Sequence, residues 1–151
     1  MWHYAPAWSV LTILPITVTY LAFQQIRRLE DETREAVIAM ADSIDARDSN
    51  TYQHSIRVSE YSQKIAARLK LGYEMEDRIA LVARVHDFGK IGVPNHVLFK
   101  NGALGDAEWQ ALRLHPQIGA EILAKYRLFK GGRTWYFTIT RNMTALVIRT
   151  D

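Results

Sequence analysis

Five consecutive residues constrain this chain more than any other part of its sequence: His86, Asp87, Phe88, Gly89 and Lys90. A histidine beside an aspartate offers an imidazole nitrogen and a carboxylate to one metal ion, a pairing that suits iron, manganese or zinc. Gly89 lets the backbone turn close to a bound group, and Lys90 places a positive charge where an anionic substrate would sit. A His-Asp pair is weak evidence alone, so its meaning depends on further ligand-type residues to either side.

Two more histidines flank this segment. His54 lies upstream, and His115 lies downstream, directly before a proline. Between them, residues 89–94 read Gly-Lys-Ile-Gly-Val-Pro. This ordered set resembles the HD superfamily of metal-dependent phosphohydrolases. The Gly-Lys-Ile-Gly-Val-Pro extension is typical of its HD-GYP branch, and the resemblance covers roughly Ile44 to Gly132.

The resemblance implies a chemistry and a set of site residues. In HD-GYP proteins, metal ions activate a bridging water or hydroxide that attacks a phosphodiester of cyclic di-GMP, a bacterial second messenger. Carried over by motif, His54, His86 and Asp87 would bind the first metal, and Asp87 would bridge to a second metal shared with His115. Asp87 and Lys90 would be the catalytic residues, with Lys90 facing the phosphate. The implied cofactor is a pair of divalent ions, iron or manganese.

The C-terminal segment does not follow the family pattern. The second half of an HD-GYP domain carries His-His-Glu and Gly-Tyr-Pro motifs, which supply the remaining metal ligands, and residues 133–151 contain neither. One permitted choice of codons from Arg133 onward, read in a shifted frame, encodes both motifs in the family order. We therefore expect residues 133–151 to be an out-of-frame tail and the truncated chain to be inactive. A true family variant is the alternative, and sequencing the coding DNA distinguishes the two.

The composition limits the remaining possibilities. The 151 residues suffice for one compact domain, or for a smaller domain with an anchor. The net charge of +3 comes without a basic stripe interleaved with aromatic residues, so nucleic acid is not an expected partner. Cysteine is absent, so any metal must be bound by histidine and carboxylate.

The N-terminal segment differs in character from the rest. Ala7–Phe23 carries no charge, has aromatic residues near its ends and is followed by Arg27 and Arg28. This pattern predicts a transmembrane anchor helix within residues 1–25, the last span of a longer sensor. The soluble part would then be cytoplasmic at the bacterial inner membrane. A buried core helix is the alternative reading, because Pro15 and several threonines weaken the span.

The rest of the chain up to residue 132 has helical patterning. For residues 26–45 we expect a juxtamembrane signalling helix through which two copies could pair. For residues 46–132 we expect the N-terminal half of an HD domain. Within that half we expect helices over 51–71, 76–87, 106–114 and 116–128. Ile56, Tyr61, Ile65, Ala66 and Leu69 fall on one predicted apolar face of the first of these helices. The predicted class is all-α: a partial HD-domain helical bundle preceded by one transmembrane helix.

Two other functions fit parts of the sequence. One is a different HD-type phosphohydrolase that acts on other nucleotides, although residues 90–94 argue against it. The other is a non-catalytic membrane-bound interaction module that dimerises through residues 26–45. A metal-dependent hydrolysis assay on cyclic di-GMP, with other nucleotides as controls, separates these possibilities.

Overall fold

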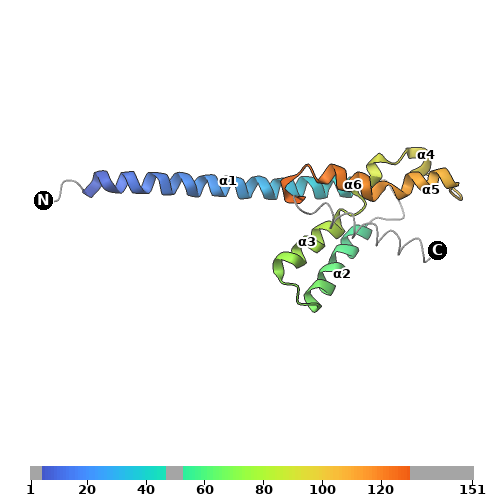
Figure 1. Ribbon diagram of the computed structural model, residues 1–151, viewed down its shortest axis with the longest axis horizontal. Coiled ribbons are helices and arrows are strands. Elements are labelled where there is room, and N and C mark those ends of the chain that lie inside the picture. Colours follow the sequence, from blue (N-terminus) through green and yellow to red (C-terminus); the bar gives the residue numbers. More distant parts are fainter. Residues whose placement is uncertain (1–4, 47–52, 130–151) are drawn as a thin grey trace. The chain divides into compact units, whose positions relative to one another are not determined.

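The computed structural model describes residues 5–46 and 53–129, with side chains from residue 11 onward. Within these ranges the chain forms helices and turns and no strand, so the predicted all-α class is confirmed (Figure 1). The predicted out-of-frame tail at 133–151 lies outside the described residues. The elements are α1 (Ala5–Asp45), α2 (His54–Arg68), α3 (Tyr73–Arg84), η1 (Phe88–Gly92), α4 (Asn95–Leu98), α5 (Asp106–Arg113), α6 (His115–Leu123) and η2 (Arg127–Phe129).

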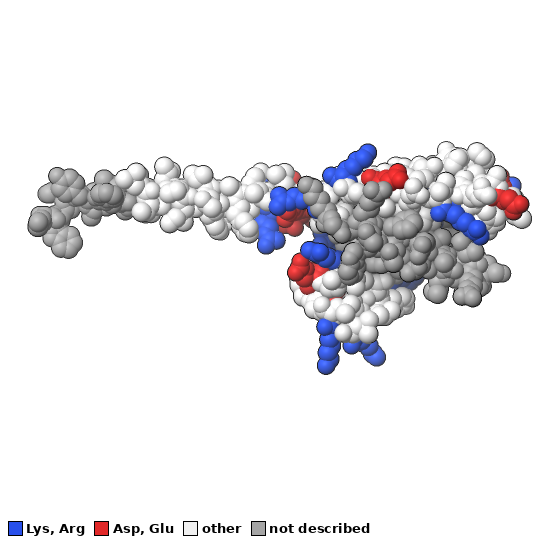
Figure 2. All heavy atoms as spheres, in the orientation of Figure 1, with Lys and Arg blue, Asp and Glu red and all other residues white. Residues whose placement is uncertain are grey.

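The chain divides into two compact units, Met1–Glu35 and Ala36–Asp151. The described part of the first unit is helical throughout and belongs to α1. Its residues 11–26 carry no charged side chain and are white in Figure 2, whereas charged residues follow from Arg27. The predicted anchor Ala7–Phe23 overlaps this stretch and lies within α1. In the described part of the chain, however, no helix combines the length and the apolar character that a bilayer crossing needs.

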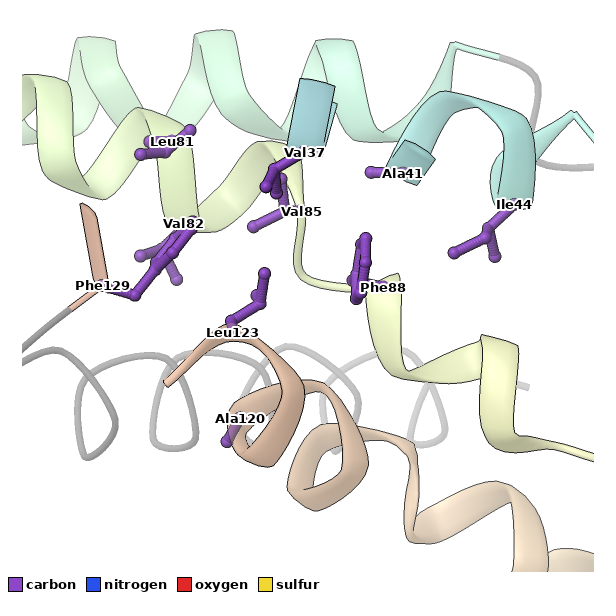
Figure 3. Packing of buried hydrophobic residues seen from close by; sticks show 10 residues of the cluster. All are labelled: Val37, Ala41, Ile44, Leu81, Val82, Val85, Phe88, Ala120, Leu123 and Phe129. Carbon is purple, nitrogen blue, oxygen red and sulfur yellow. The ribbon is translucent and has the colours of Figure 1, made fainter. Parts of the chain in front are cut away.

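The second unit is built around one hydrophobic core. Its buried residues come from the last turns of α1, from α3 and the turn after it, and from η1, α6 and η2 (Figure 3). They are Val37, Ala41, Ile44, Leu81, Val82, Val85, Phe88, Ala120, Leu123 and Phe129. The end of α1 and the segments that carry His86, Asp87 and His115 therefore share one packed interior, which fixes their relative positions.

Helices α2 and α3 form an antiparallel pair that packs side by side (Figure 1). Helix α2 ends at Arg68, and Lys70 then adopts a left-handed conformation with φ 55°. The Leu71 N–H donates to the Ala66 carbonyl, which satisfies one of the last carbonyls of the helix. The helix is therefore shorter than the predicted range 51–71. Gly72 directly precedes α3, with φ 85°, where glycine bears no steric penalty.

The predicted apolar face of α2 is mostly exposed. Only Ala66 of the predicted set is buried, whereas Tyr61, Ile65 and Leu69 are 61%, 60% and 65% exposed. The side of α2 that contacts α1 and α3 instead carries small residues. Ser55 is buried, and the Ser59 hydroxyl donates to the Ala80 carbonyl on α3 at 2.7 Å. Exposed apolar residues on one helix face are typical of a surface that another segment covers.

The segment that carries the His-Asp pair also differs from its prediction. We expected one helix through Asp87, but α3 ends at Arg84 and residues 85–87 form a turn that leads into η1. Asp87 has φ −89° and ψ 4°, a backbone region that active-site residues often occupy. Periodicity could not reveal this break, because Val85 is buried and continues the apolar pattern of α3.

Candidate metal centre

Asp87 lies between the side chains of His86 and His115, two histidines that are far from each other in the sequence. Its Oδ1 atom is 3.5 Å from Nε2 of His86 and 3.5 Å from Nε2 of His115. All three side chains are buried. His86 comes from the turn after α3, and His115 is the first residue of α6. The structure thus brings together three of the four predicted metal ligands around one carboxylate oxygen.

Backbone carbonyls orient both histidines. Nδ1 of His86 lies 2.9 Å from the Ala83 carbonyl, and Nδ1 of His115 lies 2.8 Å from the Leu112 carbonyl. A carbonyl can only accept, so each Nδ1 must carry the proton and donate it. In a neutral imidazole the Nε2 atom then has the lone pair, and here it faces Asp87. Metal-binding histidines are commonly fixed in this tautomer by the same kind of bond.

Burial keeps His115 in the neutral form that binds metals. Loss of solvent around the ring lowers the pKa of His115, although the negative charge of Asp87 acts in the opposite direction. An imidazolium would bring a second proton to Nε2 and could not bind a metal. In the neutral form the Nε2 lone pair of His115 faces Oδ1 of Asp87, and a divalent cation held by both atoms would stabilise this arrangement.

Gly89 explains why His115 can approach Asp87 so closely. The first residues of η1 pack directly on the start of α6. A Cβ atom added at Gly89 would lie 1.7 Å from the His115 carbonyl oxygen and 2.6 Å from the Gly119 nitrogen. These are backbone atoms that cannot rotate away. Any side chain at this position would push η1, and with it Asp87, away from α6.

Lys90 binds the other oxygen of Asp87. Its Nζ atom lies 2.9 Å from Oδ2, one turn of η1 away. Burial by itself would raise the pKa of Asp87, but His86, Lys90 and His115 together outweigh that effect and lower it. The carboxylate is therefore held in its charged form. The structure therefore shows Lys90, the predicted phosphate-facing residue, in contact with Asp87.

His54 lies at the edge of this group. It is the first residue of α2 and is half-buried, and its ring centroid is 5.5 Å from that of His86, with the two rings tilted by 60°. Burial and the neighbouring His86 lower the pKa of His54. The structure therefore places the fourth predicted ligand beside the other three, next to His86 rather than in contact with Asp87.

Sequence reasoning missed one acidic residue close to the centre. Asp45, the last residue of α1, is buried and accepts a hydrogen bond from the Ser55 hydroxyl. Burial raises the pKa of Asp45, and the negative charge of Asp87 adds to the increase. No motif marks Asp45, because it stands before the first histidine of the pattern and its role depends on where α1 ends.

The chemical types of these potential ligands suit a divalent cation. Neutral imidazole nitrogens and a carboxylate are the ligands that iron, manganese and zinc accept in proteins. Adjacent ligands of one such ion lie about 3.0–3.4 Å apart when each metal–ligand bond is about 2.1 Å, depending on whether the geometry is octahedral or tetrahedral. The two separations from Oδ1 of Asp87, 3.5 Å each, are just above this range. Accordingly, the described residues contain no group of three or more histidine or acidic side chains already close enough to hold an ion.

Comparisons with known proteins identify the family of this sequence. The sequence profile of the HD domain family matches residues 51–142, a range that continues beyond Gly132 into the segment predicted to be out of frame. A cyclic di-GMP phosphodiesterase response regulator, RpfG, of Xanthomonas campestris is 34% identical over 99 residues, which are 66% of this chain and 26% of that protein.

Two further relatives come from other bacteria. The 3'3'-cGAMP-specific phosphodiesterase 3 of Vibrio cholerae is 39% identical over 68% of this chain and 22% of its own length. A cyclic di-GMP phosphodiesterase of Thermotoga maritima is 35% identical over 52% of this chain and 22% of its own length. The chain thus spans only about a quarter of the length of these relatives. It belongs to the HD domain family of metal-dependent phosphohydrolases, and its similarities are consistent with the HD-GYP branch.

Proposed function

We propose that this chain carries the first half of a metal-dependent phosphodiesterase site of the HD-GYP type. The observation that carries the proposal is the convergence of two Nε2 atoms, from His86 and His115, on Oδ1 of Asp87. A divalent ion bound there would supply Lewis-acid activation of water and would neutralise charge on a phosphoryl oxygen. The chain's own residues orient the imidazoles and keep the Asp87 carboxylate charged.

The metal-binding step can be tested without any substrate. In a calorimetric titration with Mn²⁺, the chain should bind the ion, and His115→Ala and Asp87→Asn should each lose most of that affinity. His96→Ala is the matched control, because His96 lies exposed on α4 and has no predicted role. Equal affinity of the His115 and His96 variants would refute the ligand assignment.

The proposed substrate class is cyclic dinucleotides, with cyclic di-GMP as the first candidate. Relatives named for cyclic di-GMP and for 3'3'-cGAMP support the class. A hydrolysis assay should compare both compounds with linear dinucleotides and mononucleoside triphosphates in Mn²⁺ or Fe²⁺. Preference for a mononucleotide would favour the alternative, another HD-type nucleotide phosphohydrolase.

We further propose that the chain as given hydrolyses cyclic di-GMP only at background level. The second metal of an HD-GYP site requires histidines of a His-His-Glu motif that this sequence does not contain. A version with the shifted reading frame after Gly132 should gain activity in Mn²⁺, and Asp87→Ala in that version should abolish it. Strong activity of the unaltered chain would contradict this proposal, and coding DNA that cannot encode the motif would exclude the frameshift.

Membrane attachment and pairing of two copies are separate proposals that rest on the N-terminal sequence. Apolar side chains such as Leu11, Ile16 and Phe23 are exposed along α1, as an anchor or a paired helix requires. The full chain and a version that begins at Gln24 should be fractionated from bacteria and analysed by sedimentation. Recovery of the full chain without detergent would contradict the anchor and the inner-membrane location, and a monomer in detergent would contradict the dimer.

A further inference from the structure

Asp45 and Ser55 form a buried hydrogen bond beside the candidate metal centre. Asp45 is the last residue of α1 and is 7% exposed, and Ser55 is the second residue of α2 and is 1% exposed. The Ser55 hydroxyl donates to Oδ2 of Asp45. Ser55 directly follows His54, so this bond fixes the backbone position from which the His54 side chain projects.

In the described part of the chain, no side-chain hydrogen bond caps the first turn of α2, although capping is the usual way to secure a helix N-terminus. Gln53, the residue before the helix, has φ 64°, a left-handed conformation that is unfavourable for a residue other than glycine. Such a conformation persists only where neighbouring contacts enforce it. The hydrogen bond between Ser55 and Asp45 holds the chain two residues beyond Gln53.

A second contact from the same turn of α1 reaches the other side of the centre. Oδ1 of Asp42 lies 2.6 Å from a guanidinium nitrogen of Arg84, the last residue of α3. The last turn of α1 thus contacts both the helix that begins with His54 and the helix that ends just before His86. This arrangement places the two rings 5.5 Å apart.

We infer that Asp45 is a positioning residue that holds His54 beside His86 through its hydrogen bond with Ser55. The inference deepens the proposed function and rests on it for the view that His54 serves as a metal ligand. Asp45 acts through Ser55 and is not itself assigned to the metal. Partners of this indirect kind typically change metal affinity by about 10–100-fold when they are removed.

The first experiment needs no metal and therefore does not depend on the proposed function. Imidazole NMR signals of His54 and His86 should be recorded with a chelator present, and assigned with His54→Gln and His86→Gln variants. Ser55→Ala and Asp45→Ala should shift both signals, because the two rings lose their fixed separation. Ser59→Ala is the matched control, since it removes another hydroxyl bond of α2, to the Ala80 carbonyl, one turn farther along. It should leave the His54 signal in place.

The second experiment measures Mn²⁺ affinity in the same variants. Asp45→Ala and Ser55→Ala should each weaken binding about 10-fold or more, and the double variant should be no weaker than either single one. Asp45→Asn should bind Mn²⁺ more tightly than Asp45→Ala and close to the unaltered chain, because the amide oxygen of asparagine can accept the same hydrogen bond from Ser55. Failure of the Asn variant to bind more tightly than the Ala variant would show that Asp45 acts by charge or as a ligand, and would overturn the inference.

The two experiments separate the inference from the proposed function. If the unaltered chain binds no Mn²⁺ while Ser55→Ala still shifts the His54 signal, the positioning role stands and the proposed metal site fails. If Ser55→Ala and Ser59→Ala leave the His54 signal and the Mn²⁺ affinity equally unchanged, the positioning role fails. If Ser55→Ala does not fold, the His54 signal and the Mn²⁺ affinity of Asp45→Asn are compared with those of Asp45→Ala instead. Equal values for these two variants would contradict the positioning role.

Discussion

Nε2 of His115 lies 3.5 Å from Oδ1 of Asp87, and this contact joins the start of α6 to the turn before η1. It exists because η1 packs on α6 at Gly89, where no side chain intervenes. The metal centre proposed for this chain is therefore a consequence of close backbone packing as much as of its ligand residues. That dependence gives the first prediction.

Gly89→Ala should weaken Mn²⁺ binding as strongly as His115→Ala does. The added methyl group would overlap the His115 carbonyl, so η1 must move away from α6 and Asp87 must separate from His115. We expect a loss of at least about 1–3 kcal/mol in the free energy of unfolding, the range typical of overpacking. Calorimetry and urea denaturation measure the two effects. Gly105→Ala is the control, because a Cβ there makes only an ordinary contact with Glu108.

Asp45 and Asp87 should affect stability with opposite dependence on pH in the metal-free chain. The pKa of Asp87 is lowered by folding, so its stabilising contribution is present at neutral pH and is lost as the pH falls through the folded-state value. The pKa of Asp45 is raised, mainly by burial, so protonation at lower pH relieves an unfavourable charge.

The measurement is urea denaturation between pH 7 and pH 3. As the pH falls, the unaltered chain should lose stability relative to Asp87→Asn and gain it relative to Asp45→Asn. Parallel curves for the two variants would contradict the opposite shifts of the two pKa values.

Leu123→Ala should destabilise the second unit strongly. Leu123 is buried in the centre of the core, and its truncation leaves a cavity that the packed helices cannot close. The expected cost is about 2–5 kcal/mol in the free energy of unfolding. Leu69→Ala removes the same atoms from an exposed site directly after α2 and should change stability by less than about 0.5 kcal/mol. Similar losses for the two variants would show that the core is not organised as described.

Charged substitutions on α2 should improve solubility without a loss of stability. Ile65→Lys and Leu69→Lys replace exposed apolar side chains that favour association between molecules. Concentration-dependent light scattering should fall in the double variant, and the urea midpoint should stay unchanged. Ala66→Lys, at a buried position on the same helix, is the contrasting case and should unfold the chain. A lower urea midpoint in the double variant would show that the face is packed.

The helical class, the approximate extent of the longer helices and the family could be predicted from the amino-acid sequence. Those features depend on local information: apolar spacing along α5 and α6, Pro116 in the first turn of α6, and the ordered ligand-type residues of the HD pattern. Each of these features can be recognised from a few neighbouring residues or from the order of residues along the chain, without knowledge of the fold.

How these residues meet could not be predicted, because it depends on packing between distant segments. Helix α3 ends before His86, Lys90 contacts Asp87, Asp45 contacts Ser55, and Ile65 is exposed. These outcomes depend on contacts between segments distant in sequence, such as η1 against α6, and on which helix face finds a partner. Local periodicity marks a face as apolar, but only packing against another element determines whether that face is buried.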